Sequence, residues 1–596
     1  MYTAYHVSHR LYVRFSPEGR YDKTSMIARR TVIRWFHTLP ARTKFVVGIA
    51  ALFPWLAVFT VFQTIDDIYL SDSISTTMMF REPFQLHTVL AMDYHTFLFK
   101  LPLFFIEERL GLTVTTHSIV SLIFTTSMFA CFGYIAYKLT KSYRYTLLAL
   151  IATLTLFILI PPRYSLNNMT MPSMRNIEYG LFFLAFYWLY ASRRKRYTII
   201  AAAILTILTA SDPMFTPYGV AASGIVVTYT YVRYLRRSLS ARSMYTTARA
   251  FFIGIGSAVA GDLLLKTVSH IGLVTIGQGE LGLKYVGGYV ESVPKATELF
   301  IDGTQSLFTS LGIDAFQPSF LNPLNVGATF LVVLLVALVI IALHRRRKIS
   351  TPHDTWRERY ILFAGALPII TLGAYTLSQH PGQSSAIRFF HINLFVLCIS
   401  VAYALSVLKA PITRPITMMV AAIFIVFSFA GVSQAHQYAS YTTSTVSPLV
   451  DTVIDSLERE HVSAIAGDYW YVYPIALRSD IAHHKSLALV PLVQQCSAFQ
   501  AYFIDERWSH PVINNNETLA IITSTQPLTY EDETSLSSMN TRCSAKLAIA
   551  HFGEPIKQYT IEAAPHSGLY SYRILIYSAR SIERVDTQLM QRRLQQ

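Results

Sequence analysis

The sequence predicts an α-helical polytopic membrane protein with a C-terminal soluble α/β domain. Its 596 residues are 52% hydrophobic and only 14% charged, a composition too apolar for an ordinary soluble protein. Apolar segments long enough to cross a bilayer recur as far as residue 432, and a more polar sequence follows. Lysine and arginine lie in short clusters between the apolar segments, as in the cytoplasmic connections of membrane proteins.

Residues 1–44 are polar and basic, and they lack the short apolar core and small-residue site of a cleavable signal. We expect them to lie in the cytoplasm. The transmembrane domain is expected over residues 45–432 with about eleven spanning helices, because a hydrocarbon core of ~30 Å needs roughly 20 apolar residues. The predicted spans lie near 45–63, 116–138, 144–161, 177–191, 197–211, 218–235, 247–269, 326–344, 360–377, 389–408 and 414–432.

The basic clusters test this topology. They occupy alternate connections, at 138–144, 193–196, 233–242, 345–348 and 409–414. The positive-inside rule therefore places the N-terminus in the cytoplasm and, with an odd number of spans, the C-terminus outside. The short fourth and fifth segments alternatively form a hairpin of partly spanning helices, which leaves the parity unchanged. The net charge of +15 follows from these connections, so we expect no nucleic-acid partner.

Two of the predicted outer connections are long, at residues 64–115 and 270–325, and long loops often carry function. Residues 97–111 are apolar and aromatic with late polar residues, which predicts a helix lying in the membrane interface. The second loop contains the acids Glu280, Glu291, Glu298 and Asp302, which suit short interfacial helices around a site.

Residues 433–596 predict a small extracytoplasmic α/β domain. The pattern favours an amphipathic helix over 447–461 and strands over 462–465, 487–490, 519–523 and 572–577. The aromatic segment 467–474 follows a strand, so it forms either a ligand loop or a packed aromatic turn.

Cys131 and Cys398 fall in apolar segments. Only Cys496 and Cys543 are placed to form a disulfide, and the sequence leaves that bond open.

Acids at a membrane edge are candidates for function, because a charge there is costly unless it is paired or used. Asp66 and Asp67 follow the first predicted span directly. Such a pair can hold a divalent cation, or one carboxylate can act as a general base while the other orients it. The alternative is a solvated helix cap.

The segment Asp66-Asp67-Ile68-Tyr69, followed by Phe99-Lys100-Leu101-Pro102-Leu103, resembles the first outer loop of GT-C glycosyltransferases. These membrane enzymes include the protein O-mannosyltransferases and the lipid A aminoarabinose transferases. Asp67 stands where the family has Glu, and Leu101 replaces a proline; Asp93-Tyr94-His95 is an overlapping alternative match. Ser173-Met174-Arg175-Asn176-Ile177-Glu178 is similar to the Ser-Arg and following acid of the family's second outer loop.

This resemblance implies a glycosyltransferase that moves a sugar from a polyprenyl-phosphate donor to an envelope glycan, lipid or protein at the outer membrane face, with inversion. Asp66 is then the general base, with Asp67 as the alternative. The candidate ligands for the donor phosphate are Lys100, Arg175 and Arg388, unless these cations instead reach lipid headgroups. The other candidate site residues are Tyr69, Asp93, His95 and Glu178.

Metal use stays open at this point. His95, His380 and His391 are candidates to join Asp93 or Glu178 around a divalent ion, but their spacing indicates no particular metal. Asp212 is either another acid of the outer face or part of a helix stop and turn. Asp262 and Lys266 are expected to form an intramembrane ion pair facing the helix bundle.

The rival functions are a transporter or lipid flippase, and an envelope sensor or assembly protein with an outer binding domain. Internal repeats and helices broken at matching positions, which are common in transporters, are not evident in the sequence. We expect a bacterial plasma membrane as the location.

Overall fold

The structure is a computed structural model of the whole chain. It describes residues 40–67, 97–159, 170, 175–192, 194–212, 214–236, 239–270, 292–313, 323–348, 355–377, 387–408, 410–484, 487–493, 496–498, 518–524, 543–563 and 571–578. A short N-terminal unit, Met1–Ala51, separates from the rest of the chain, Leu52–Gln596, and the contacts below all lie within the second unit.

A helix occupies each apolar segment that the sequence predicts to span the membrane. Within the described residues, five helices are long and apolar enough to cross a bilayer, and three shorter helices are also strongly apolar. The bundle helices are α3 (Ala41–Asp67), α6 (Val114–Thr140), α7 (Tyr143–Leu159), α8 (Ile177–Ala191), α9 (Lys195–Ser211), α10 (Phe215–Leu235), α11 (Ala241–His270), α14 (Pro323–Lys348), α15 (Thr355–Thr376), α17 (Ile392–Val407) and α18 (Ala410–Tyr441). The chain is therefore an integral membrane protein.

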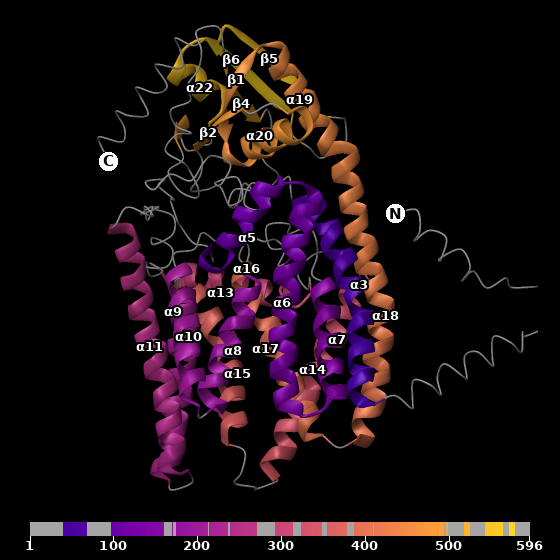
Figure 1. Cartoon of the computed structure of the whole chain (residues 1–596), viewed down its shortest axis with the longest axis vertical. Coiled ribbons are helices and arrows are strands. Elements are labelled where there is room, and N and C mark those ends of the chain that lie inside the picture. Colours follow the sequence, from indigo (N-terminus) through magenta and orange to yellow (C-terminus); the bar gives the residue numbers. More distant parts are fainter. Residues whose placement is uncertain are drawn as a thin grey trace, which may run out of the picture. The chain divides into compact units, whose positions relative to one another are not determined.

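Aromatic side chains fill the centre of the helix bundle. Phe132 of α6 stacks on Phe395 of α17 at 4.2 Å between ring centroids, and Phe186 of α8 stacks on Phe363 of α15 at the same separation. Figure 1 shows these helices running side by side. One close approach requires glycine: a Cβ on Gly261 of α11 would lie 2.9 Å from a backbone nitrogen of α9.

Three shorter helices lie in the two long connections and before α17. They are α5 (Phe97–Leu110), α13 (Val293–Thr309) and α16 (Ile387–Phe390). The prediction of a helix over 97–111 is confirmed. Thr113 then begins α6 with a capping box, because its side chain accepts from the Thr116 N–H while the Thr116 hydroxyl accepts from the Thr113 N–H.

The C-terminal domain is a six-stranded sheet in the order β3-β2-β1-β4-β6-β5. The strands β2, β1 and β4 are parallel, and the other pairings are antiparallel. The predicted helix and strands are confirmed within a few residues. The strands are β1 (Val462–Asp468), β2 (Ala488–Val493), β3 (Ser497–Ala498), β4 (Thr518–Ser524), β5 (Lys557–Ile561) and β6 (Tyr572–Ser578).

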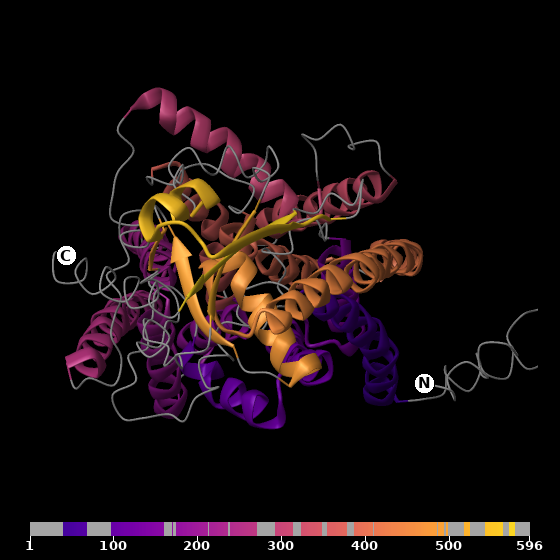
Figure 2. The same cartoon turned by 90° about the horizontal axis from the view of Figure 1, so that it is seen from above.

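Helices cover both faces of this sheet, as the view in Figure 2 shows. The helices α19 (Ser447–Arg459) and α20 (Tyr469–His483) share a core with one face, and α22 (Ala545–Phe552) shares a core with the other. A disulfide joins Cys496 to Cys543, with their Cα atoms 4.3 Å apart.

The prediction that 467–474 is a loop or turn is wrong, because α20 begins at Tyr469, directly after β1. Burial of Val472, Tyr473 and Ile475 against the sheet stabilises this helix.

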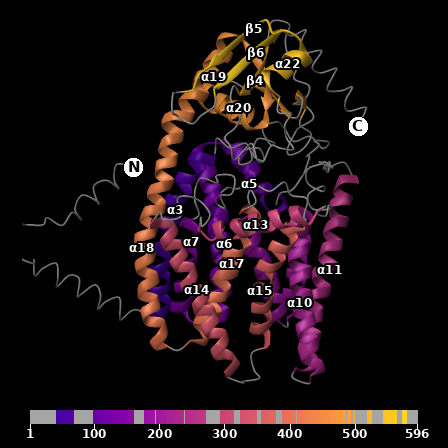
Figure 3. The same ribbon diagram turned by 180° about the vertical axis from the view of Figure 1, so that it is seen from behind.

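The last bundle helix leads without a break into the C-terminal domain. A π-helical turn, η4 (Thr442–Val446), joins α18 to α19, so the backbone stays helical from Ala410 to Arg459. This long helical path is visible from behind in Figure 3.

Candidate functional site

The start of α8 positions two of the predicted site residues. Asn176 caps the helix, since its side-chain oxygen accepts from the Ile177 N–H at 2.7 Å. Glu178 accepts from the Asn176 N–H through Oε2 at 3.0 Å. Arg175 precedes the cap. The cap therefore fixes the direction of the Glu178 carboxylate and leaves its other oxygen, Oε1, for a partner from another helix.

That partner is Lys100 of α5. Its Nζ lies 3.0 Å from Oε1 of Glu178, and both side chains are 0% exposed. The ammonium group also lies 5.1 Å from the centroid of the Phe124 ring on α6. A buried ion pair loses much of its Coulomb energy to desolvation, so it is weak evidence for a purely stabilising role.

A second buried ion pair lies at the same end of the bundle. The Nε–H of Arg175 donates to Oδ2 of Asp212, which directly follows α9, and the two side chains are 3% and 0% exposed. Asp212 also accepts from the Met214 N–H at 3.0 Å through Oδ1. The sequence left Asp212 open between an outer-face acid and a turn residue; its bond to Met214 fits the turn, while its other oxygen pairs with Arg175.

The guanidinium of Arg175 has a further nitrogen that the ion pair does not use. Its Nη2 is buried and has no hydrogen-bond partner among the described residues. The guanidinium lies 5.7 Å from the centroid of the Phe389 ring on α16, and the hydroxyl of Tyr218 on α10 donates to the Phe389 carbonyl at 3.0 Å. An unpaired, buried guanidinium nitrogen is costly unless a ligand uses it.

His391, between α16 and α17, completes this cluster. Its side chain is buried, its Nε2 has no hydrogen-bond partner within the described part of the chain, and Arg175 is near enough to act on it electrostatically. We refer to Lys100, Arg175, Glu178, Asp212 and His391 as the charged cluster. Its five residues come from four separate stretches of sequence, and the two ion pairs sum to no net charge.

The structure brings Lys100, Arg175 and Glu178 together. The alternative that Lys100 and Arg175 reach lipid headgroups is wrong, because both side chains are buried in ion pairs. Asp66 and Asp67 are the last two residues of α3, and Arg388 lies in α16, but the side chains of all three lie outside the described part. The positions that lie wholly outside it are Tyr69, Asp93, His95, His380, Glu280 and Glu291.

Sequence reasoning missed a buried pair between α5 and α6. Oε1 of Glu107 on α5 lies 2.6 Å from Nδ1 of His117 on α6, and both side chains are 0% exposed. The available signal was the acid itself, because a Glu within an apolar helix needs a partner. Asp302 of α13 similarly accepts from the hydroxyl of Tyr375 on α15.

The prediction for Asp262 and Lys266 of α11 is partly wrong. The ion pair forms, with Nζ 2.7 Å from Oδ2, but the side chains are 63% and 69% exposed. They point away from the bundle rather than into it. The spacing of four residues predicts contact along a helix and contains no information about which face of the helix packs.

Metal ligands do not gather at the charged cluster in the described residues. The group of His, Asp and Glu side chains close enough to hold an ion lies instead in the C-terminal domain. Of the candidates named for a metal near the membrane, Glu178 is engaged by Lys100, and Asp93, His95 and His380 lie outside the described residues.

Comparison with known proteins finds likeness to solved structures but not to known sequences. No family model matches the chain, and no curated protein matches its sequence. The chain is similar to the solved structure of ArnT from Cupriavidus metallidurans bound to undecaprenyl phosphate, at a TM-score of 0.48 and 11% identity, over 90% of this chain and 99% of that one.

Proposed function

We propose that this chain is a membrane glycosyltransferase that moves a sugar from a polyprenyl-phosphate donor to an acceptor of the cell envelope. The reaction takes place at the outer face of the membrane and inverts the anomeric carbon. The acceptor is an envelope glycan, lipid or protein. The supporting sequence features are the motifs around Asp66 and Lys100 and the segment that contains Arg175 and Glu178.

The observation that carries this proposal is the charged cluster. Its cations, Lys100 and Arg175, are buried and held by carboxylates, while Nη2 of Arg175 has no hydrogen-bond partner in the described residues. Negative charge grows on the leaving phosphate as the glycosidic bond breaks, and fixed donors in a dry site stabilise such charge strongly. The planar guanidinium of Arg175 suits a phosphate that is already oriented by its lipid tail.

The remaining chemistry needs a base for the acceptor. Asp66 is proposed to take the proton from the acceptor hydroxyl as its oxygen attacks the sugar. Asp66 and Asp67 end α3, and we propose that this end of α3 lies on the same side of the membrane as Lys100. The apolar surfaces of the spanning helices supply the groove that the polyprenyl chain requires.

The proposal requires one topology, with the N-terminus in the cytoplasm and the C-terminal domain outside. A reporter that is active only outside the cytoplasm is expected to work when fused after residue 433 and to fail when fused after Arg196 or Lys348. A cytoplasmic C-terminus would move the proposed site to the wrong face and reject the assignment.

The function itself is tested in two steps. Mass analysis of envelope glycans, lipids and proteins, with and without this chain, identifies the sugar-bearing product that disappears. The purified protein in lipid nanodiscs is then assayed for thermal stabilisation by a polyprenyl monophosphate, with the matching polyprenol as the ligand that lacks phosphate. Stabilisation by the phosphate alone is the expected result.

A matched pair of variants sharpens this test. Arg175→Lys keeps the charge but removes the planar fork, so it is expected to lower transfer and weaken the response to polyprenyl phosphate. Arg196→Lys makes the same change at an exposed position and is expected to leave both unchanged. Movement of an intact lipid-linked sugar across the bilayer, without release of polyprenyl phosphate, would instead identify a flippase and reject the proposal.

A further inference from the structure

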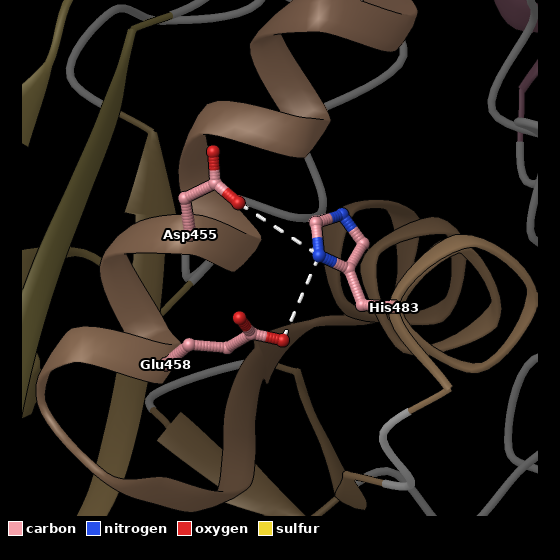
Figure 4. Close-up of side chains that lie close together, drawn as sticks. All are labelled: Asp455, Glu458 and His483. Carbon is pink, nitrogen blue, oxygen red and sulfur yellow. Dashed lines mark ion pairs between the residues drawn. The ribbon is translucent and has the colours of Figure 1, made fainter.

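The C-terminal domain carries a second group of charged side chains, far along the sequence from the charged cluster. Asp455 and Glu458 lie one turn apart on α19, and His483 is the last residue of α20. Their ligand-type atoms all lie within 4.8 Å of one another. Figure 4 shows both carboxylates directed at the same ring nitrogen, Nδ1 of His483.

The spacing of these atoms is informative. Nδ1 of His483 lies 3.7 Å from Oδ1 of Asp455 and 3.6 Å from Oε1 of Glu458. Both separations are longer than the roughly 2.7–3.2 Å of a normal hydrogen bond. Two ligand atoms bound tetrahedrally to one Zn²⁺, with bonds of about 2.0–2.2 Å, lie roughly 3.4 Å apart. The two separations are thus too long for hydrogen bonds and close to the spacing of two ligand atoms on one ion.

The other nitrogen of the imidazole faces a third carboxylate. Nε2 of His483 faces Oδ1 of Asp451 at 3.7 Å. Asp451 is held by Arg478, whose Nε and Nη2 donate to its two oxygens at 2.8 and 2.9 Å. This separation is also longer than a hydrogen bond, so Asp451 contributes negative charge beside the ring, which favours a bound cation. Arg478 balances the charge of Asp451, whereas the partner that Asp455 and Glu458 share is the ring of His483.

We propose that Asp455, Glu458 and His483 bind the divalent cation of a first-row transition metal, for which Zn²⁺ is the best fit. One imidazole nitrogen and two carboxylates suit Zn²⁺ and its neighbours, whereas Ca²⁺ and Mg²⁺ prefer oxygen ligands alone. Asp455 and Glu458 are 62% and 37% exposed, so the ion enters from solvent and water completes its coordination. The bound ion ties the end of α20 to α19 and stabilises the domain.

The test uses the full-length protein, purified without a polyhistidine tag and stripped with EDTA. Equilibrium dialysis against Zn²⁺ followed by elemental analysis gives the zinc bound per chain. The chain has 18 histidines, so the decisive quantity is the difference between the parent and a variant. His483→Asn is expected to lose one micromolar-affinity zinc site and to abolish the zinc-dependent rise in unfolding temperature.

Two further variants keep the test independent of folding defects. His484→Asn alters the adjacent exposed histidine, whose φ of 52° asparagine tolerates, and it is expected to bind zinc as the parent does. Asp455→Asn changes a largely exposed side chain and is expected to weaken binding by about tenfold or more. Equal zinc binding by parent, His483→Asn and Asp455→Asn overturns the proposal. Binding only at millimolar zinc, an adventitious ion only, also overturns it.

Discussion

Nζ of Lys100 lies 3.0 Å from Oε1 of Glu178, with both side chains fully buried. Removal of one partner leaves the other charge unpaired, which typically lowers the free energy of unfolding by about 3–5 kcal/mol. We therefore expect Lys100→Met and Glu178→Gln each to destabilise the protein strongly, as measured by denaturant unfolding in detergent.

The double variant Lys100→Met/Glu178→Gln separates stability from activity. Because no buried charge is left over, its loss of stability is expected to be much smaller than the sum of the single losses. Sugar transfer is nevertheless expected to stay low, since the cation near the proposed phosphate position is gone. Recovery of both stability and transfer would assign the pair a structural role only.

Asp66 and Asp67 are expected to differ in function although they are neighbours. Consecutive residues on a helix point about 100° apart, so one carboxylate faces a given acceptor while the other does not. Asp66→Asn removes a base with little change in volume, and it is expected to lower the transfer rate by ~10² to 10⁴ fold with little effect on folding. Asp67→Asn is the matched control. Transfer by Asp66→Asn at the parental rate contradicts the assignment.

The disulfide between Cys496 and Cys543 is expected to stabilise the C-terminal domain. The two residues are 47 positions apart, and closing a loop of that length contributes roughly 4 kcal/mol in the chain-entropy model. The paired variant Cys496→Ala/Cys543→Ala is expected to unfold at lower denaturant concentration, while Cys131→Ala, which alters a free thiol, serves as a reference. Free alkylation of both thiols in the unreduced protein would contradict the bond.

The C-terminal domain is expected to lose stability in acid through Asp451. Hydrogen bonds from Arg478, with the nearby His483 as a smaller contribution, hold the pKa of Asp451 below its ordinary value of 3.8. The folded state thus binds a proton less readily than the unfolded chain. This contribution is fully present above about pH 4 and is lost as the pH falls through the lowered pKa.

Unfolding curves of the full chain, measured at steps of about one pH unit between pH 2.5 and 6, check this expectation. Asp451→Asn is expected to flatten the acid side of the stability profile, and Arg478→Gln to flatten it similarly. Asp455→Asn, which alters a carboxylate that Arg478 does not hold, is expected to have a smaller effect. An unchanged slope in both Asp451→Asn and Arg478→Gln would contradict the sign of the pKa shift.

The sequence predicts the helices well because length and apolarity decide which segments enter a membrane. It also places Lys100, Arg175 and Glu178 on one face, since the parity of the spans fixes the side of every connection. It does not predict that Lys100 contacts Glu178, because hydropathy contains no information on which helices are neighbours around the bundle. The pair of Glu107 and His117 was missed for the same reason.

Local pattern also failed where packing decided the structure. The aromatic run and Pro474 favour a turn after β1, yet burial of Val472 and Ile475 against the sheet makes the segment a helix. Asp455 and Glu458 look like ordinary polar residues on an amphipathic helix. Their relation to His483 depends on how α19 and α20 pack together, and no pattern within either helix contains that relation.

The π-helical turn Thr442–Val446 sets the angle at which the C-terminal domain is oriented about the axis of α18. Each residue of a helix turns the chain by about 100° and advances it by about 1.5 Å. Deletion of one residue from this turn would leave the length of the connection almost unchanged, yet it would rotate Val450, Val453 and Ile454 out of line with the sheet they pack against. The turn therefore determines the orientation of α19 about the helix axis far more than its distance along that axis.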